Sequence, residues 1–546
     1  MLFPRSGAMK IAVEGCCHGE LDKIYAAMQH VERAEGITID LLICCGDFQA
    51  VRNVDDLECM SVPQKYKALG TFHEYYSGRK RAPYPTLFIG GNHEASNYLY
   101  ELYYGGFVAP DIFYLGHSGV VHFGDLRVGG LSGIFKAGDY RKGHHERPPF
   151  AGRDVKTAYH VREFDVGKLK RLREPLDVFL SHDWPRGVAR HGDLEGLLRR
   201  KRFLAEEIRD DSLGSPPARE LMTALKPAFW FSAHMHVKFA ALVTHDDGRE
   251  TRFLALDKCL PGRDFMQILD FPDKRPDGGF ALDPEWLAIL RANHRLDSLD
   301  HRGTPGDAAL SGEGEHRAFV DAKASFSPPG EEDDLYRTTT RRGAEAEAEA
   351  EAEEAAKKPE AEAEAEAETE AEAERETSSG GGERNRNDGD GGEEKNNTRP
   401  IGGRRRRRGP APPAFAPTAP AHDPERETRR AGRGIAPSVV ARNPQTLALL
   451  EMLELDFKLD APPREERGGG GDGAARAYRP PPPPPPPRGE PFVRPGAPLA
   501  PPPNAGVTAY AIPGRGPFGT LVPRNLPPPP RLADGNEIEL DEDEEA

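Results

Sequence analysis

The chain is poor in the residues that would cross-link it or hold it in a bilayer. It has six cysteines in 546 residues, and four of them stand in two adjacent pairs inside apolar runs, at 16–17 and 44–45. Such pairs make a poor disulfide framework, so they favour a reducing compartment and a role in packing or metal binding. No apolar stretch approaches the length of a membrane span, and the start has no long apolar signal-peptide core. We therefore expect a soluble, intracellular chain that does not bind membranes.

The second half of the sequence has few large apolar residues. After about residue 302 it is dominated by Ala/Glu, Gly, Arg and Pro. A segment of this composition cannot bury enough surface to offset the entropy of ordering it. We predict one folded region of roughly 300 residues and a long, mostly disordered remainder. One exception is NPQTLALLEMLEL (443–455), whose apolar residues have helical spacing and could pack on the folded part.

An excess of acidic residues does not exclude a nucleic-acid substrate. The formal net charge is −16, but much of the acid lies in the Ala/Glu repeat at 344–374 and in the terminal LDEDEEA. The charge near a site decides whether it attracts a polyanion. The run Arg404–Arg408 is open to three interpretations, a nuclear localisation element, an RNA contact or a plain solvated charge run. The run Pro480–Pro487 should form polyproline II and could bind a WW or SH3 domain.

Polar groups follow five strand-like apolar runs in the first 240 residues. CCH follows MKIAVEG, GD follows IDLLICC, GNHE follows YPTLFIG, SHD follows PLDVFL, and AHMH follows AFWFS. Strands that alternate with helical segments predict a layered α/β domain, in which ligands gather where strands end. Each group alone is more simply a structural residue. Together they predict a metal site, in which a carboxylate can bridge two cations that act on a phosphate ester.

This series of groups resembles the calcineurin-like metallophosphoesterases, whose usual series is D-x-H, G-D, G-N-H-E/D, H and G-H-x-H. Longer stretches resemble the RNA lariat debranching enzymes in particular: VEGCCHGELDKIY, LSGIFKAGDYRKGHHERPPF, FLSHDWPRG, FSAHMHVKFAAL and FLALDKCLPGRDFMQILD. The resemblance is dense from Met9 to Asp270. It extends to DPEWLAIL (283–290) and NPQTLALLEMLEL, which are similar to the C-terminal domain of that family.

The resemblance implies an α/β fold of the metallophosphoesterase type, with a two-sheet β sandwich flanked by helices. The expected parts are an N-terminal extension at 1–8, a catalytic domain at 9–272 with a recognition loop at 132–150, and a C-terminal domain at 273–460. An Ala/Glu-, Gly- and Arg-rich disordered insertion should interrupt the C-terminal domain at about 302–435. A disordered Pro-rich and acidic tail should follow at 461–546.

The resemblance also implies roles for individual residues. Two metal positions would be formed by Cys16, His18 and His236 and by Asn92, His182 and His234, with Asp47 between them. The residues expected to act in catalysis are His93, Asp47 and Asn92. His93 would be the general acid, because an imidazole has its pKa near neutral pH. Glu94 should orient His93 or a neighbour, Asp183 should support the adjacent His182, and Cys17 should face the core or shield the site.

One departure from the wider superfamily concerns the metal. Cys16 stands where the superfamily has the Asp of D-x-H. A thiolate is softer than a carboxylate and favours Zn or Fe(II) over Mg. It also offers one donor atom, so the number of bound ions stays open. The family fits Fe(II), Zn(II) or Mn(II), with one or two ions.

The segment 136–150 resembles the recognition loop of the family. Its candidate RNA contacts are cations for phosphates and rings for bases, namely Lys136, Tyr140, Arg141, Lys142, His144 and His145, with Arg147 as a further cation. Single-stranded RNA is commonly bound by such a mixture. The alternative interpretation is a solvated basic loop.

The function implied by the resemblance is metal-dependent hydrolysis of the 2′,5′-phosphodiester branch of excised intron lariat RNA, in the nucleus. Splicing-associated proteins are candidate partners of the tail. One alternative is a metallophosphoesterase for another substrate, such as phosphoproteins, although those enzymes usually continue GD as GDxxDRG and this chain has GDFQAVRN. Another is a non-catalytic RNA-binding scaffold, against which the complete ligand set argues.

Overall fold

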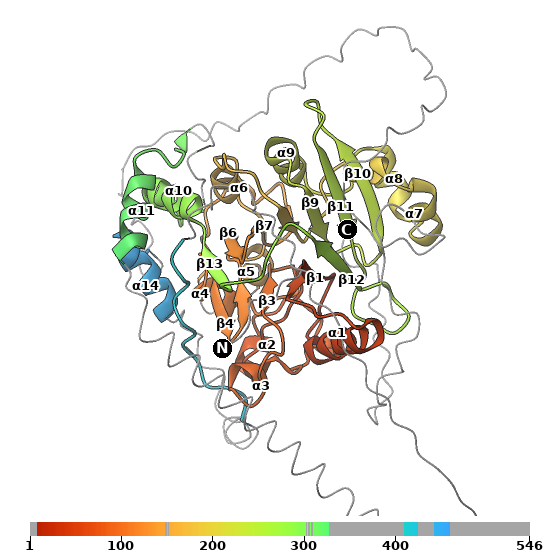
Figure 1. Ribbon diagram of the computed structural model, residues 1–546, viewed down its shortest axis with the longest axis horizontal. Coiled ribbons are helices and arrows are strands. Elements are labelled where there is room, and N and C mark those ends of the chain that lie inside the picture. The colour runs from red at the N-terminus through yellow and green to blue at the C-terminus, as the bar shows by residue number, and fades with distance from the viewer. Residues whose placement is uncertain are drawn as a thin grey trace, which may run out of the picture. The chain divides into compact units, whose positions relative to one another are not determined.

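Figure 1 shows the computed structural model of the chain. The structure describes residues 8–147, 150, 152–301, 303, 306, 309–326, 409–423 and 442–458, and apart from 322–326 these belong to one compact unit. The predicted extension at 1–8, except for Ala8, and the predicted tail at 461–546 lie outside the described residues. No helix among the described residues is long and apolar enough to cross a membrane.

The first sheet has six strands in the order β12-β1-β2-β3-β5-β4. Its strands are β1 (Met9–Glu14), β2 (Leu41–Cys44), β3 (Thr86–Phe88), β4 (Gly106–Ala109), β5 (Ile112–Tyr114) and β12 (Met266–Phe271). β1, β2, β3 and β5 run parallel, whereas β12 and β4 are antiparallel to their neighbours. Parallel strands β1, β2 and β3 therefore all end at the same edge of the sheet.

The second sheet has seven strands in the order β10-β11-β9-β8-β7-β6-β13. Its strands are β6 (Ser118–Phe123), β7 (Leu126–Leu131), β8 (Val178–Ser181), β9 (Phe229–Ser232), β10 (Phe239–Thr244), β11 (Glu250–Ala255) and β13 (Phe280–Leu282). β7, β8, β9 and β11 run parallel. One apolar core contains side chains from both sheets, such as Ile11, Leu87, Phe179 and Phe231. The predicted two-sheet α/β sandwich is confirmed.

Helices cover the outer faces of the sandwich (Figure 1). They are α1 (Leu21–Glu35), α2 (Val54–Leu57), α3 (Phe72–Tyr76), α4 (Ser96–Glu101), α5 (Asp154–Thr157), α6 (Glu163–Leu169), α7 (Leu194–Arg200), α8 (Leu204–Arg209), α9 (Pro216–Leu225), α10 (Pro284–Asn293), α11 (His316–Phe326) and α14 (Pro444–Leu453). Short 3₁₀ turns occur at Gln64–Tyr66, Val188–His191 and His294–Leu296. A second core, against α1, α3 and α4, fills the outer face of the first sheet. Ser215 caps α9 by accepting a hydrogen bond from the N–H of Ala218, and Pro216 occupies the first turn.

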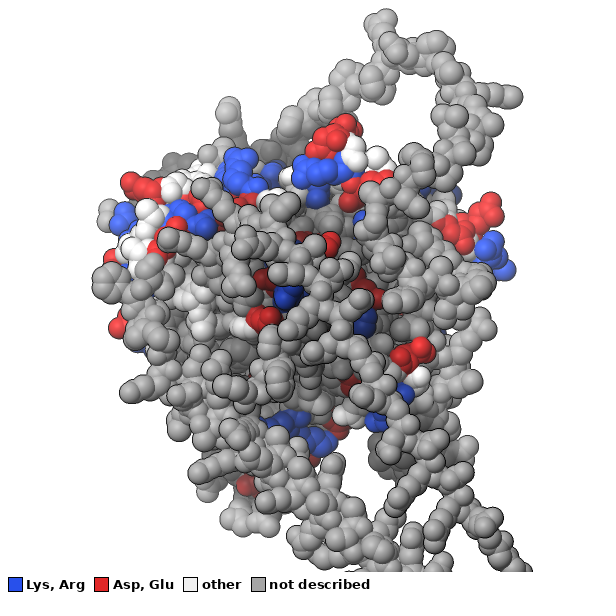
Figure 2. Space-filling model, in the orientation of Figure 1, with Lys and Arg blue, Asp and Glu red and all other residues white. Residues whose placement is uncertain are grey.

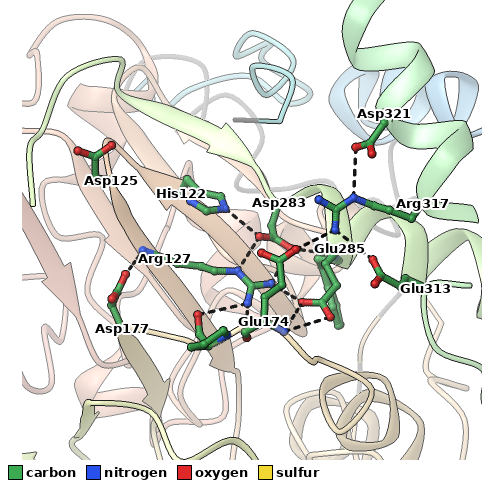
Figure 3. A network of polar contacts seen from close by, with 12 residues as sticks. His122, Asp125, Arg127, Glu174, Asp177, Asp283, Glu285, Glu313, Arg317 and Asp321 are labelled. Carbon is green, nitrogen blue, oxygen red and sulfur yellow. Dashed lines mark hydrogen bonds and ion pairs between the residues drawn. The ribbon is translucent and has the colours of Figure 1, made fainter. Parts of the chain in front are cut away.

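A buried ionic network joins the C-terminal elements to the second sheet (Figure 3). Arg127 on β7 donates to both carboxylate oxygens of Asp283, at 2.7 and 2.9 Å, and to Glu285 at 2.8 Å. Asp283 also caps α10 and contacts His122 of β6 at 2.8 Å. At the edge of the network, Arg317 of α11 pairs with Glu174, with Glu313 and with Asp321, at 3.0 to 3.2 Å.

Two parts of the stretch predicted to be a disordered insertion, about 302–435, pack on the folded unit. One is the first part of α11, where Val320 is buried in the sandwich core. The other is 409–423, an extended segment (cyan in Figure 1) that we call the strap. In the strap, the hydroxyl of Thr418 accepts a hydrogen bond from Arg52, and the N–H of Ala419 donates to the hydroxyl of Tyr76. The composition did not predict the strap, because a Pro/Ala-rich extended segment needs no internal hydrogen bonds. Its hydrogen-bond partners lie instead on the surface on which it packs. The rest of the predicted insertion lies outside the described residues.

The predicted helix in NPQTLALLEMLEL is present as α14. Asn443 caps it, and Pro444 occupies its first turn. The side-chain amide of Gln445 pairs with both the N–H and the carbonyl of Phe107 on β4, at 2.7 and 2.8 Å. The C-terminal helix therefore satisfies backbone groups at the free edge of the first sheet.

Candidate metal centre

The ends of five parallel strands carry the predicted site residues to one place. β1 leads into Cys16 and His18, β2 into Asp47 and β3 into Asn92. From the second sheet, β8 leads into His182, and β9 leads into His234 and His236. The main chain of one sheet touches the other here, because the N–H of His234 donates to the Cys16 sulfur at 3.2 Å. The two sheets thus share this edge.

One group of donors consists of Cys16, His18, Asp47 and His236. One ligand atom of each lies within 4.8 Å of the others. His18 Nε2 lies 3.3 Å from His236 Nε2 and 3.7 Å from Asp47 Oδ2. Two imidazole nitrogens that face one another beside a carboxylate and a thiol form a cradle for a cation.

A second group lies on the other oxygen of the same carboxylate. His182 Nε2 is 3.4 Å from Asp47 Oδ1 and 3.2 Å from Asn92 Oδ1. The ring of His234 lies 5.0 Å from the ring of His182. Asp47 therefore turns one oxygen toward each group, as a bridging carboxylate would.

The backbone at this edge is unusual. His18, Asp47, His234 and His236 all adopt positive φ, between 45 and 65°. Residues other than glycine seldom occupy this left-handed region, and such strain collects at functional sites. In this turn conformation, consecutive side chains do not alternate between two opposite faces, as they would in a strand. As predicted, Cys17 faces away from Cys16 and packs in the outer core.

The protonation of the first donor group, His18 and His236, fits a cation. Burial lowers the pKa of His18 to about 4, and burial together with the neighbouring His18 lowers the pKa of His236. Both rings therefore stay neutral, which is the form that ligates metals. Burial opposes a proton on His182, but the charge of Asp47 and hydrogen bonds raise its pKa to about 9. Burial also raises the pKa of the Cys16 thiol, a penalty that an adjacent cation would remove.

His93 stands half-buried beside the two groups. Its N–H donates to Asp47 Oδ1 at 2.9 Å, and its Nδ1 lies 3.2 Å from the carbonyl oxygen of Ser61. A carbonyl only accepts, so Nδ1 carries a proton and the ring is fixed in one tautomer. Nε2 lies 3.2 Å from the side-chain nitrogen of Asn92. Ser61 was not predicted, because no motif marks a carbonyl 32 residues away.

Two supporting acids differ in their partners. Glu94 accepts from the N–H groups of Phe48, Gln49 and Gly91, so it joins the loops of Asp47 and Asn92. The hydrogen-bond partner of His182 Nδ1 is the Cys45 carbonyl, at 2.8 Å, whereas Asp183 acts on His182 through its charge.

Asp183 instead accepts from the N–H of Phe135 at 2.8 Å and lies 3.8 Å from His234. Adjacency in the chain does not predict these contacts, because the partners come from other strands.

The predicted recognition loop is only partly turned outward. Lys136 and Arg141 are exposed. Tyr140 packs edge-on against Phe135, and Lys142 pairs with Asp139. His145 is half-buried, and its Nδ1 lies 3.1 Å from the Gly143 carbonyl oxygen.

His144 is placed differently from the expectation. Its ring stacks on His117 at 4.2 Å and bonds Asp165 at 2.7 Å. A ring held in this way is not free to stack on an RNA base, so His144 belongs to the support of the loop.

Comparison with known proteins divides the chain in a similar way. Residues 9–238 match the family described as calcineurin-like phosphoesterase, and residues 248–458 match the family described as lariat debranching enzyme, C-terminal domain. The chain is 57% identical over 294 residues to lariat debranching enzyme A of Xenopus laevis, covering 53% of this chain and 55% of that protein. It is 56% identical over 301 residues to the lariat debranching enzyme of Homo sapiens, covering 54% and 55%.

A plant relative is matched over more of its length. The chain is 54% identical over 297 residues to the lariat debranching enzyme of Arabidopsis thaliana, covering 54% of this chain and 71% of that protein. The matched region thus spans about half the length of the vertebrate relatives.

Proposed function

Because the chain belongs to the lariat debranching enzyme family, we propose that it hydrolyses the 2′,5′-phosphodiester at the branch of excised intron lariat RNA. The observation that carries the proposal is the carboxylate of Asp47. It faces one group of donors with each oxygen and also holds the backbone of His93. A shared carboxylate beside a fixed imidazole suits phosphodiester hydrolysis.

The donor groups would hold one or two divalent transition-metal ions. Cys16, His18 and His236 would hold one, Asn92, His182 and His234 the other, and Asp47 would serve both. A bound cation supplies Lewis-acid stabilisation of the charge that develops on the phosphoryl oxygens. The sulfur and nitrogen donors favour Fe(II), Zn(II) or Mn(II) over Mg.

His93 would act as the general acid. A water oxygen bonds to phosphorus and releases a proton to solvent, while the bond from phosphorus to the 2′-oxygen breaks. His93, in its imidazolium form with a proton on each ring nitrogen, gives the Nε2 proton to that leaving oxygen. The products are a 5′-phosphate and a free 2′-hydroxyl. The Ser61 carbonyl supports this role because it fixes the ring through Nδ1 and leaves Nε2 for the exchange.

The exposed cations of the recognition loop, Lys136 and Arg141, would contact RNA phosphates. The face shown in Figure 2 mixes basic and acidic side chains, so their local position matters more than the net charge. We also place the protein in the nucleus, where lariats form. The supporting run Arg404–Arg408 and the candidate tail partners lie outside the described residues.

The test is a debranching assay under anaerobic conditions. The purified protein receives Fe(II), Zn(II) or Mn(II) after chelation, together with a branched RNA, a linear RNA of the same sequence and a phosphopeptide. We expect conversion of the branched RNA alone. Intact branches with every metal, in folded protein, would refute the proposal, and phosphate release from the peptide at a comparable rate would favour a phosphatase.

A further inference from the structure

An exposed aromatic ring stands in a basic turn between α7 and α8. Phe203 is 57% exposed and is the most exposed large apolar residue among those the structure describes. The ammonium of Lys201 lies 5.5 Å from the centre of its ring, and Arg202 is exposed between them. A single exposed ring is common on protein surfaces and carries little by itself. The residues around Phe203 therefore decide whether the ring indicates a binding surface.

A second segment brings cations to the edge of the metal centre. Lys258 forms a parallel backbone bridge with Cys16, and the N–H of Cys259 donates to the Cys16 carbonyl at 3.2 Å. Arg263, in the same loop, is half-exposed and lies 3.5 Å from Asp257. The loop that follows β11 thus carries two cations beside a predicted metal ligand.

Charged side chains of both segments act on Asp257. This buried carboxylate interacts with the charges of Arg263, Lys201 and Lys258 together. Lys238, two residues after His236, pairs with Asp264 at 3.9 Å, and the Asp264 carbonyl accepts the N–H of Asp257. Among the described residues named here, the cations Lys201, Lys238, Lys258 and Arg263 accompany two carboxylates, Asp257 and Asp264. We call the set the rim surface, which consists of Lys201, Arg202, Phe203, Lys238, Lys258 and Arg263.

Cations around a flat exposed ring match the chemistry of single-stranded nucleic acid. Each nucleotide offers one negative phosphate and one base face, and aromatic stacking on bases does not depend on sequence. An acidic protein segment would use the cations but would gain little from the ring. Lys258 of the rim surface forms a backbone bridge with Cys16, one of the metal ligands in the proposed function.

We propose that the rim surface binds a single-stranded arm of the branched RNA, with Phe203 stacking on a base and Lys201, Lys258 and Arg263 contacting phosphates. It is a surface separate from the recognition loop, built from the α7–α8 turn and the loop after β11. The inference rests on the proposed function for the identity of the RNA. The contact itself needs only single-stranded RNA.

The first experiment compares two branched substrates with the full chain. One substrate has a minimal branch, and the other carries a single-stranded arm of about ten nucleotides, which is within the span of known single-strand sites. Phe203→Leu keeps apolar area but loses the aromatic face. We expect the ratio of kcat/KM for the long substrate over the minimal one to fall about fivefold or more, since stacking contributes ~1–3 kcal/mol per base.

Matched variants separate stacking from a general loss of surface. Phe203→Trp keeps an aromatic face and should retain the ratio of the parent protein. Leu242→Ala removes another exposed apolar residue, 42% exposed on β10, and should also retain it. An unchanged ratio in Phe203→Leu, or an equal fall in Phe203→Trp, would overturn the proposal.

The second experiment measures binding without turnover. Fluorescence anisotropy follows a labelled linear single-stranded RNA as the salt concentration is raised. Arg263→Gln and Lys201→Gln should each reduce the slope of log K against log salt by ~0.7, the value for one phosphate contact on a single strand. An unchanged slope in both would overturn the phosphate contacts, and equal binding of a polyglutamate peptide would assign the surface to a protein partner instead.

The two experiments also separate this proposal from the proposed function. If the parent protein cleaves neither branched substrate, the debranching activity fails. Binding of the linear RNA, and its weakening in Phe203→Leu, would still support the rim surface. If the parent cleaves both substrates and Phe203→Leu binds the linear RNA as the parent does, the rim surface fails and debranching stands.

Discussion

Asp47 is the residue on which both donor groups depend. Burial disfavours its charge, but the nearby imidazoles of His182, His93 and His18 hold the pKa of its carboxyl well below the usual range. The carboxylate therefore stays ionised although it is almost completely buried. The charge of Asp47 also keeps a proton on His182 when no cation is bound. That proton competes with a metal ion for the ring nitrogen.

His93→Ala tests the general acid. We expect kcat for a branched RNA to fall by ~10²–10⁴-fold, the usual contribution of a general acid, because the 2′-oxygen must then leave without a proton. Metal content, measured by elemental analysis, should equal that of the parent, since His93 lies in neither donor group. Loss of metal from the variant would show that His93 holds the centre rather than the proton.

The stability of the metal-free protein should depend on His182. Its folded pKa of about 9 lies above the ordinary value of 6.5, so its stabilisation is complete below pH 6.5 and is lost as pH rises toward 9. Melting temperatures in chelator should therefore fall over that window. His182→Asn should remove this part of the fall, and a variant that melts with the same pH dependence as the parent would contradict the assignment.

Among the elements, the loops after β2 and β3 determine the site because they approach each other closely. A Cβ on Gly91 would lie 2.1 Å from Asp47 Oδ1 and 2.8 Å from the ring of His182. A Cβ on Gly46, at φ 116°, would lie 2.3 Å from the same ring. These two glycines leave the room in which the carboxylate and the imidazole meet.

Gly91→Ala should therefore displace Asp47 without removing any ligand. We expect metal content and debranching to fall together, while circular dichroism shows a folded protein. Gly312→Ala is the matched control, because its Cβ would meet nothing within 4 Å. Full metal content in Gly91→Ala would show that the loops can move apart at little cost.

At the scale of the whole molecule, buried ion pairs hold the C-terminal elements against the second sheet. Arg127→Met would leave Asp283 and Glu285 buried without their guanidinium. Breaking a buried pair in this way costs ~3–5 kcal/mol, which chemical denaturation would show. Arg317→Met, at the partly exposed edge of the network, should cost ~0–1 kcal/mol. Equal losses in the two variants would mean that burial does not govern the network.

The strap makes a second connection, to Arg52 after β2 and to Glu101 of α4. The hydroxyl of Thr418 accepts from Arg52 at 2.9 Å and donates to Glu101 at 2.5 Å. Thr418→Val leaves both charged groups short of a partner, so the free energy of unfolding should fall by ~1–3 kcal/mol. Thr418→Ser keeps the hydroxyl and should lose less. A loss as large in the serine variant would point to packing instead.

The sequence by itself determined the layered α/β class, the edge at which the site forms and the identity of its candidate ligands. Short apolar runs with polar groups at their ends are local features, and parallel strands bring such ends together. The helix 444–453 and the cap of α9 were predictable for the same reason, because capping residues and helical spacing are written in the adjacent sequence.

Only the tertiary structure decided which partners these residues have. The carbonyl groups of Ser61 and Cys45 that orient His93 and His182 bear no side-chain signal, and the inward turn of His144 depends on His117 and Asp165 from other elements. The contacts of the strap with Arg52 and Tyr76 likewise join segments that are far apart in the chain. Composition reports how much apolar surface a segment can bury, but a contact made by the backbone or across distant loops depends on where the fold places both partners.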